Sequence, residues 1–342
     1  MTRRERVIDA FRHKQTDFIP YEAGFTQKEH EIYAAYVGDD DFQSKLGNHS
    51  SGSYYSGFSP GISGPVEGKP DYIKDDFGVV WNRSVDKDIG VIDGYILDEP
   101  DLSAFEPPPI DMGEQKRGYE LLFTNNDDRF TYGSIGFSMF ERAWTLRGME
   151  NILTDMLMEP AFVEGLLDAI CDFNMEIVNL GLSYDIDGFY FGDDWGQQKG
   201  LIMGPELWRK YIKPRMARMY GAVKAKGKFV VQHSCGDVSA IFPDLIEIGL
   251  DCYQTFQPEI YDIRAVKKEY GQDLSFWGGI STQRLLPFAT PDEVKAKTIE
   301  IMRIMGKGGG YIAAPTHAIP GDVPPENVEA MLEVFMNQSK YL

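Results

Sequence analysis

Short apolar runs alternate with amphipathic segments through the second half of the sequence. From about residue 130 onward, runs rich in β-branched and aromatic side chains predict strands. These runs are FTYGSIG (130–136), GFYFGD (188–193), KFVVQH (228–233), DCYQTF (251–256), LSFWGGI (274–280) and YIAAPT (311–316). Between them, apolar residues recur at three- and four-residue spacing and predict helices at 149–183, 205–227, 239–249, 263–271, 291–306 and 325–342. Strands that alternate with single helices are typical of parallel βα units.

The number of strand segments favours a closed barrel. Two earlier segments, FIPYEA (18–23) and residues 76–81, also predict strands and bring the total to eight. Eight βα units in 342 residues predict an α/β fold, a (β/α)8 TIM barrel that forms a single domain over residues 1–342. The alternative is an open doubly wound sheet, which is less favoured because no glycine-rich phosphate loop follows the first strand.

Two early segments lack any apolar period and predict long βα loops. Residues 47–70 are rich in Gly, Ser, Tyr and Pro, which indicates a long loop or lid above the barrel. Residues 84–128 are acidic and rich in proline, as expected of an excursion over the surface.

Composition and charge exclude several classes of protein. The chain has 34 Lys+Arg against 53 Asp+Glu, a formal charge of −19, which argues against a nucleic-acid partner. No apolar run approaches the roughly 18–20 residues that a membrane span requires. The N-terminal segment MTRRERVIDAFRHK lacks an apolar stretch and does not predict a secretory signal. The 3 cysteines cannot form a complete disulfide framework, so we expect a reducing cytoplasm.

Polar and ligand-type residues gather where the predicted strands end. In a barrel of this kind, the working residues lie at the carboxyl ends of the strands. The residues at these positions that we predict to form the site are Glu22, Asp193, Asp194, Gln198, His233, Cys235, Gln254, Trp277 and His317.

The His233-x-Cys235 pair is the sharpest feature among them. At a strand end, residues i and i+2 project to the same side. An imidazole and a thiolate placed in this way suit Zn²⁺, and His317 at a later strand end offers a third ligand. Three protein ligands with an open position are typical of catalytic zinc. The alternative is a chance pair, a histidine with ordinary partners next to an inert buried cysteine.

Asp193 and Asp194 form the second feature. Paired carboxylates after a strand suit acid/base catalysis or the orientation of a substrate, so we predict that they are catalytic. The alternative is that one of them caps the turn or helix that follows. We predict that Glu22, Gln198, Gln254 and Trp277 contact a small-molecule substrate, with Trp277 as pocket lining.

The residues also resemble a known family, the uroporphyrinogen decarboxylase superfamily, and within it the branch of cobalamin-dependent zinc methyltransferases. The resemblance covers nearly the whole chain. It is strongest in DIDGFYFGDDWGQQKGLIMGPELWRKYIKP, HSCGDVSAIFPDLIEIGLDCYQTFQP, LSFWGGISTQ and GGGYIAAPTHAIPGDVPPENVEAM. It implies a (β/α)8 barrel with its site at the carboxyl ends of the strands.

The resemblance also implies a metal site. The methyltransferase branch holds zinc through a His-x-Cys pair, which His233 and Cys235 match, and through a Cys before the PPEN segment. The third position here is His317, which departs from the Cys of that branch and resembles the histidine that the decarboxylases use for substrate contact. His317 is therefore expected to be either a metal ligand or a substrate contact.

One departure from the decarboxylases bears on the substrate. The decarboxylases carry arginines after the first strand that grip the carboxylates of the substrate. The corresponding segment here, residues 19–33, has no arginine, and Glu22 would repel a polyanion. We therefore do not expect true uroporphyrinogen decarboxylase activity.

The methyltransferase resemblance implies that the protein moves a methyl group between a thiol or other small nucleophile and a corrinoid. Bound Zn²⁺ would activate the nucleophile. The corrinoid would be carried by a separate small protein, and the 47–70 loop would be a lid or docking surface for it. The competing hypotheses are a metal-independent lyase of the decarboxylase type that acts through Asp193 or Asp194, and a non-catalytic barrel. The sequence is compatible with a monomer or a homodimer.

Overall fold

The computed structural model describes residues 1–103, 105–125 and 128–342, and the chain divides into two compact units. Unit 1 comprises Met1–Ser51, Asn126–Thr131 and Asp251–Leu342, and unit 2 comprises Gly52–Asn125 and Tyr132–Leu250. The single domain predicted for residues 1–342 stays a prediction. Among the described residues, no helix combines the length and apolar character that a membrane crossing requires.

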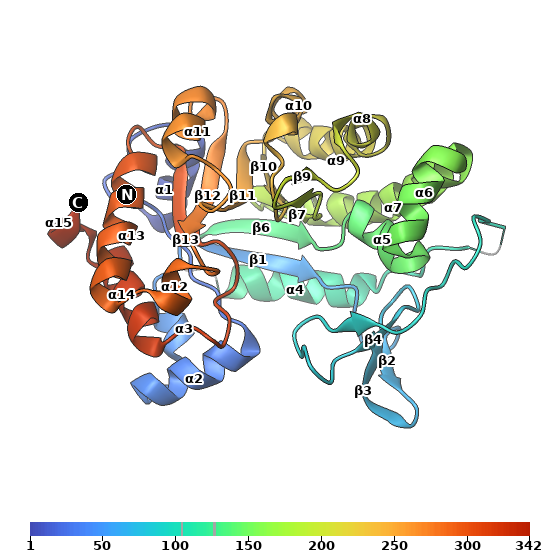
Figure 1. Cartoon of the computed structure of the whole chain (residues 1–342), viewed down its shortest axis with the longest axis horizontal. Coiled ribbons are helices and arrows are strands. Elements are labelled where there is room, and N and C mark those ends of the chain that lie inside the picture. The colour runs from blue at the N-terminus through green and yellow to red at the C-terminus, as the bar shows by residue number, and fades with distance from the viewer. Residues whose placement is uncertain (104, 126–127) are drawn as a thin grey trace. The chain divides into compact units, whose positions relative to one another are not determined.

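A seven-stranded sheet is the main feature of this α/β fold (Figure 1). Its strand order is β1-β6-β7-β10-β11-β12-β13. The pairs β6–β7, β7–β10, β11–β12 and β12–β13 are all parallel, as the alternation of strands and helices predicts. The strands are β1 (Ser50–Tyr55), β6 (Phe130–Ile135), β7 (Gly188–Gly192), β10 (Phe229–His233), β11 (Cys252–Phe256), β12 (Ser275–Ile280) and β13 (Tyr311–Pro315).

Unit 1 contains eight of the described helices. They are α1 (Arg3–Phe11), α2 (Gln27–Val37), α3 (Phe42–Lys45), α11 (Ile263–Tyr270), α12 (Leu285–Phe288), α13 (Pro291–Met305), α14 (Pro325–Met336) and α15 (Gln338–Tyr341). Helix α13 begins at a capping box, in which Thr290 and Glu293 satisfy each other's backbone N–H groups. Every residue of β12 and β13 is buried, as expected for strands that are covered on both faces.

Unit 2 contains α4 (Met112–Thr124), α5 (Phe140–Arg147), α6 (Met149–Met158), α7 (Pro160–Gly181), α8 (Pro205–Leu207), α9 (Lys213–Ala225) and α10 (Phe242–Glu247). The helix predicted at 149–183 is divided at Pro160, the residue at which α7 begins. A π-helical turn, Trp208–Ile212, separates α8 from α9. Pro214 follows it and lacks the N–H that a regular α-helical bond to the residue four positions earlier would need.

The prediction of eight barrel strands is confirmed only as far as the α/β fold and the seven-stranded parallel sheet. FIPYEA (18–23) lies along β13 but forms an isolated parallel bridge, Tyr21 to Ala313, rather than a strand. Pro20 accepts a hydrogen bond from the N–H of Ala313 at 2.9 Å but has no N–H of its own to extend the ladder.

The segment predicted as a strand at 76–81 was assigned to the wrong sheet. Val80–Asn82 is strand β4 of a separate antiparallel sheet with β2 (Gly64–Val66), β3 (Lys69–Lys74) and β5 (Val91–Ile92), a group of short strands in Figure 1. Strand β1 lies instead in the 47–70 segment that we predicted as a loop or lid. Its sequence, SSGSYY, hides the alternation because serines occupy three of its buried and half-buried positions.

Candidate functional site

Strands β7 and β10 of unit 2 bring the two predicted aspartates and two of the three predicted metal ligands together at their carboxyl ends. The two strands are parallel, and their register pairs His233 with Gly192. Asp193 and Asp194 directly follow Gly192, and Cys235 follows His233 by two residues. The N–H of Asp193 donates to the carbonyl of His233 at 3.1 Å, so the ends of the two strands are fixed to each other.

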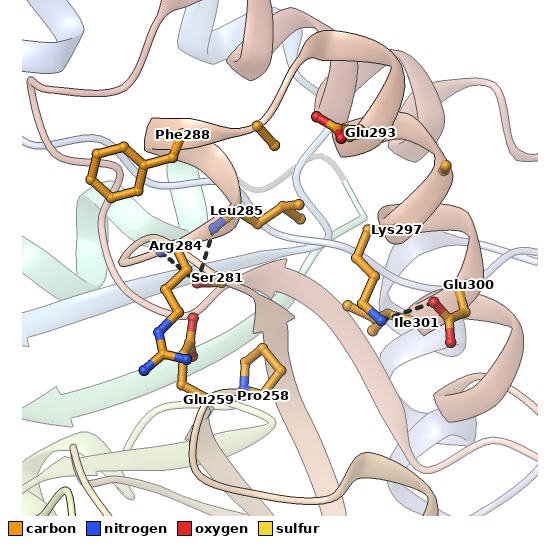
Figure 2. Close-up of a pocket in the computed structure, with 12 residues that line it drawn as sticks. Pro258, Glu259, Ser281, Arg284, Leu285, Phe288, Glu293, Lys297, Glu300 and Ile301 are labelled. Atoms are coloured by element: carbon orange, nitrogen blue, oxygen red, sulfur yellow. Dashed lines mark hydrogen bonds and ion pairs between the residues drawn. The ribbon is translucent and has the colours of Figure 1, made fainter.

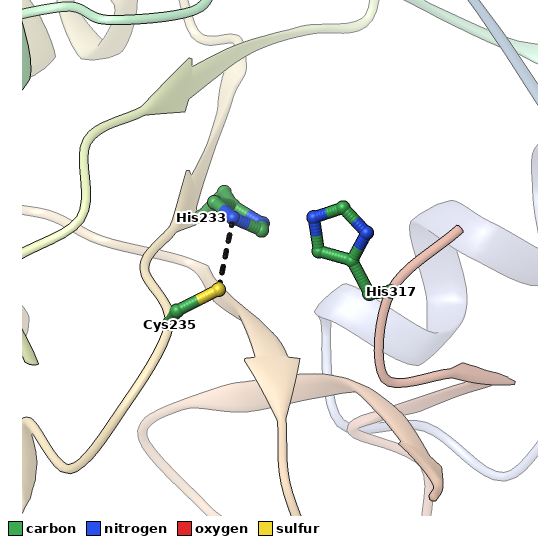
Figure 3. Close-up of side chains that lie close together, drawn as sticks. All are labelled: His233, Cys235 and His317. Atoms are coloured by element: carbon green, nitrogen blue, oxygen red, sulfur yellow. Dashed lines mark hydrogen bonds between the residues drawn. The ribbon is translucent and has the colours of Figure 1, made fainter. Parts of the chain in front are cut away.

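His233 and Cys235 face each other across this edge. The Nε2 atom of His233 lies 3.7 Å from the Sγ atom of Cys235 (Figure 3). Burial acts to lower the pKa of His233, but the tyrosine Tyr190 and the contacts with Asp194 and Cys235 outweigh it and raise that pKa well above its usual range. Burial also raises the pKa of the Cys235 thiol, against the lowering effect of His233.

A close glycine contact fixes the backbone that carries Cys235. Gly236 has a φ of +79°, and a Cβ atom there would lie 2.2 Å from the backbone carbon of Gly196. The N–H of Asp237 donates to the carbonyl of Gln197 at 2.9 Å. Only glycine fits at position 236, because any larger residue meets both the positive φ and the neighbouring backbone.

Asp194 connects the two members of the His233–Cys235 pair. Its Oδ1 atom accepts the backbone N–H of Cys235 at 2.7 Å and lies 3.4 Å from Nε2 of His233. Burial acts to raise the pKa of Asp194, but the hydrogen bond and the charge of His233 outweigh it and lower that pKa to about 2. Asp194 is therefore an ionised carboxylate at neutral pH.

Asp193 has different surroundings and a capping role. Its side chain is 0% exposed, and its carboxylate accepts the N–H groups of Met139, Phe140 and Glu141 at 3.1, 2.9 and 2.8 Å. The indole N–H of Trp195 donates to the same carboxylate. These partners make Asp193 the cap of helix α5, which has no side-chain cap of its own. The catalytic role predicted for Asp193 stays a prediction beside this capping role.

Two residues near the His233–Cys235 pair, Glu141 and Tyr190, were not predicted from the sequence. Burial raises the pKa of the Glu141 carboxyl well above its usual range, and the charges of Asp194 and Asp193 raise it further. Tyr190 lies on β7 with its ring centroid 6.4 Å from that of His233. Glu141 follows the predicted strand at 130–136, so the same search for polar residues after a strand would have found it. Tyr190 lies inside a strand, where that search gives no signal.

The remaining predicted residues are carried by other segments of the chain. Gln198 is exposed at the turn between β8 (Gly196–Gln197) and β9 (Gly200–Leu201). Glu22, Gln254, Trp277 and His317 all belong to unit 1. Glu22 accepts the N–H and the hydroxyl of Ser50 at 3.2 and 2.7 Å, and burial raises its pKa to about 7. Gln254 and Trp277 occupy paired positions on β11 and β12.

The three residues predicted as metal ligands form one group. His233, Cys235 and His317 each offer one ligand atom, and these atoms all lie within 4.8 Å of one another (Figure 3). The group offers two imidazole nitrogens and one sulfur, the donor atoms that zinc prefers. Whether the group binds a metal stays a proposal.

Acidic, imidazole and thiol groups at the carboxyl ends of parallel strands are typical of an α/β enzyme. The sequence model of the uroporphyrinogen decarboxylase (URO-D) family matches residues 84–337, which is more than half of the chain. The chain therefore belongs to the uroporphyrinogen decarboxylase family, and the family resemblance seen in the sequence is confirmed.

Relatives within the family include methyltransferases and decarboxylases. The chain is 24% identical over 191 residues to the methylated-thiol–coenzyme M methyltransferase of Methanosarcina mazei (56% of this chain, 49% of the relative). It is 27% identical over 131 residues to the methylcobamide:CoM methyltransferase MtaA of Methanosarcina barkeri (38% of this chain, 36% of the relative). It is 24% identical over 190 residues to the uroporphyrinogen decarboxylase of Psychromonas ingrahamii (52% of this chain, 50% of the relative). The chain thus spans half or less of the length of these relatives.

A solved structure shares the fold. A methyltransferase from Methanosarcina mazei superposes with a TM-score of 0.76 at 17% identity and covers 99% of both chains. At this identity the likeness shows the fold alone.

Proposed function

We propose that the protein is a zinc-dependent methyltransferase that moves a methyl group between a small thiol or other nucleophile and a corrinoid held by a partner protein. The main support for this proposal is the group of two imidazoles and one thiol from His233, Cys235 and His317. Their ligand atoms lie within 4.8 Å of one another. Two of the relatives named above are methyltransferases of thiol or methylcobamide substrates, which supports the same reaction class.

The donor set fits zinc in its catalytic form. One sulfur and two imidazole nitrogens leave a fourth position of a tetrahedral site for a substrate. When bound there, Zn²⁺ supplies Lewis acidity that keeps a thiol deprotonated near neutral pH. His317 takes the role of third ligand in this proposal, and a substrate contact is its alternative role.

The chain's own residues hold and orient this site. Asp194 fixes the Cys235 backbone and faces the ring of His233, so it sets the positions of both ligand side chains. Asp193 anchors the start of helix α5 and thereby places Glu141 beside Asp194. In this proposal, Glu22, Gln254, Trp277 and Gln198 orient the substrate, and Asp193 and Asp194 complete the catalytic residues.

The experiment that tests the proposal is metal analysis followed by a methyl-transfer assay. We expect near-stoichiometric zinc in protein purified without chelator, and transfer from free methylcobalamin to a thiol such as 2-mercaptoethanesulfonate. Cys235→Ala should lose most of the zinc and at least 100-fold in rate. Cys171→Ala, which removes a cysteine from helix α7, is the matched control and should retain both. A metal-free wild-type protein with a native fold would sink the proposal.

The partner protein is tested separately. A corrinoid-binding protein should co-purify with the tagged chain from extract of the native host or bind it in a direct assay. Monomer and homodimer are both compatible with the proposal.

A metal-independent lyase is the second candidate function. The observation that favours it is the uroporphyrinogen decarboxylase family itself, together with a buried carboxyl, Glu141, whose pKa is raised well above its usual range. A carboxyl whose pKa is raised holds its proton to a higher pH and can donate it to a carbanion left by decarboxylation. Release of CO2 from a carboxylated substrate by chelator-treated protein would favour the lyase, and Glu141→Gln should then abolish that release.

A further inference from the structure

A cavity of about 710 Å³ lies within unit 1, outside the residues assigned to the metal (Figure 2). Its floor comes from the segments that follow β11 and β12, which carry Glu259 and Arg284, and its wall comes from α12 and α13. A volume of this size is within the range of small-molecule sites. None of the lining residues belongs to the metal group, so a ligand here is independent of the proposed methyl transfer.

Two charged groups in this cavity lack partners. Both carboxylate oxygens of Glu259 are buried, and no other residue donates a hydrogen bond to them within the part of the chain that the structure describes. Across the described residues, the guanidinium of Arg284 likewise has no ion pair, and it lies beside Glu259 in Figure 2. Burial raises the pKa of Glu259, while its own backbone N–H and then the charge of Arg284 act to lower it. A buried carboxylate without a donor is unfavourable, so its presence at a cavity points to a ligand that supplies one.

The other charges of the cavity are already satisfied. The ammonium of Lys297 donates to Glu300 at 2.9 Å, and Glu293 accepts the N–H and the hydroxyl of Thr290, both at 2.8 Å. The rest of the lining is largely apolar and includes Phe288, which is 81% exposed. Of the charged groups that line the cavity, Glu259 and Arg284 therefore remain to bind a ligand, beside an apolar wall.

We propose that this cavity binds an α-amino acid with an apolar side chain. The ammonium group of the ligand binds Glu259, its carboxylate binds Arg284 as a bidentate pair, and its side chain packs on Leu285 and Phe288. A simple anion would leave Glu259 without a donor, and a simple cation would leave Arg284 without an acceptor. Because Arg284 is exposed, its side chain can change rotamer and uncover Glu259 as the ligand enters.

Calorimetric titration of the full chain with L-leucine tests the proposal. We expect saturable one-to-one binding, at least tenfold weaker for leucinamide, which lacks the carboxylate, and for N-acetyl-leucine, which lacks the ammonium. Absence of saturable heat with L-leucine would overturn the proposal, as would equal binding of the three compounds.

Substitutions at Glu259 and Arg284 test whether these two residues bind the amino acid. Glu259→Gln and Arg284→Gln should each weaken L-leucine binding at least tenfold, whereas Glu31→Gln, an exposed carboxylate on α2, should leave it unchanged. Circular dichroism checks that each variant folds. If Glu259→Gln fails to fold, Arg284→Gln decides the matter, because its side chain is exposed. Unchanged binding in Arg284→Gln would refute the assignment.

Discussion

At the scale of single residues, the environment of each carboxylate decides its role. Asp193 and Asp194 are neighbours in the sequence, yet one is surrounded by the N–H groups of helix α5 and the other by the His233–Cys235 pair. Sequence analysis predicted the same role for both, because the identity of the surrounding groups is set by tertiary packing. The structure thus separates a capping carboxylate from one that contacts the proposed metal ligands.

Asp194→Ala should weaken zinc binding about 10–100-fold, because it removes the acceptor for the Cys235 N–H and the group beside His233. Asp194→Asn should give an intermediate loss, since an amide oxygen still accepts that N–H. Competition with a chromophoric chelator measures the affinity, and the thiolate absorption band of the Co²⁺-substituted protein reports on Cys235. Asp185→Asn, a change of an exposed carboxylate near β7, is the control. Equal affinities in all the variants would refute this role for Asp194.

A second carboxylate, Glu29, gives a pH-dependent prediction for stability. Glu29 is 0% exposed, its oxygens have no hydrogen-bond partner among the described residues, and burial followed by repulsion from Asp322 raises its pKa from 4.5 to about 7. The folded state therefore binds the proton more tightly than the unfolded state. This contribution to stability is complete below the unfolded-state pKa of 4.5 and is lost as the pH rises through about 7.

Glu29→Gln should remove this pH dependence. The free energy of unfolding of the variant, relative to that of the wild type, should rise by about 1–3 kcal/mol from pH 5 to pH 8. Urea denaturation at the two pH values measures this difference. Glu31→Gln, an exposed change on the same helix, should follow the wild type. A parallel pH dependence in Glu29→Gln would contradict the prediction.

At the scale of elements, the hydrophobic pattern of the sequence predicted the strands with buried apolar side chains but not strand β1. Strands β7, β10, β11, β12 and β13 have buried apolar side chains along their length, so their pattern is visible in the sequence. Strand β1 is half serine and was predicted as a loop, because small polar residues carry no hydrophobic signal even where they are buried. The FIPYEA segment has a strand-like pattern, but Pro20 limits it to one bridge.

The loop after β10 requires glycine at position 236. Gly236→Ala should destabilise the protein by about 1–3 kcal/mol and weaken zinc binding, because a Cβ at this positive φ would meet the backbone of Gly196. Thermal unfolding and the chelator competition measure the two effects.

Gly221→Ala is the matched control for this loop. Gly221 lies in helix α9, where a Cβ atom would meet no described atom within 4 Å beyond the neighbouring backbone of its own helix, so the change should stabilise by about 0.5–1 kcal/mol. A Gly236→Ala variant as stable as this control would show that the loop tolerates a side chain.

At the scale of the whole molecule, charge argues against a polyanionic substrate. The formal charge is −19, and residues 19–33 contain no arginine. We expect no conversion of uroporphyrinogen to coproporphyrinogen by the purified protein, since the porphyrinogen carboxylates would meet a like-charged surface. Chromatography of the oxidised porphyrins measures this directly. Turnover would contradict the prediction and favour the lyase over the methyltransferase.

Trp195 gives the protein a built-in optical reporter. The indole is fully buried, donates its N–H to Asp193, and lies 5.3 Å from the ring of Trp208. Its backbone N–H donates to Ser234, the residue between His233 and Cys235, at 2.9 Å. Binding of a metal ion by His233 and Cys235 should therefore alter the fluorescence emission of Trp195. Intrinsic fluorescence should then report metal binding, and Trp195→Phe, which keeps the other 4 of the 5 tryptophans, should lose this part of the signal.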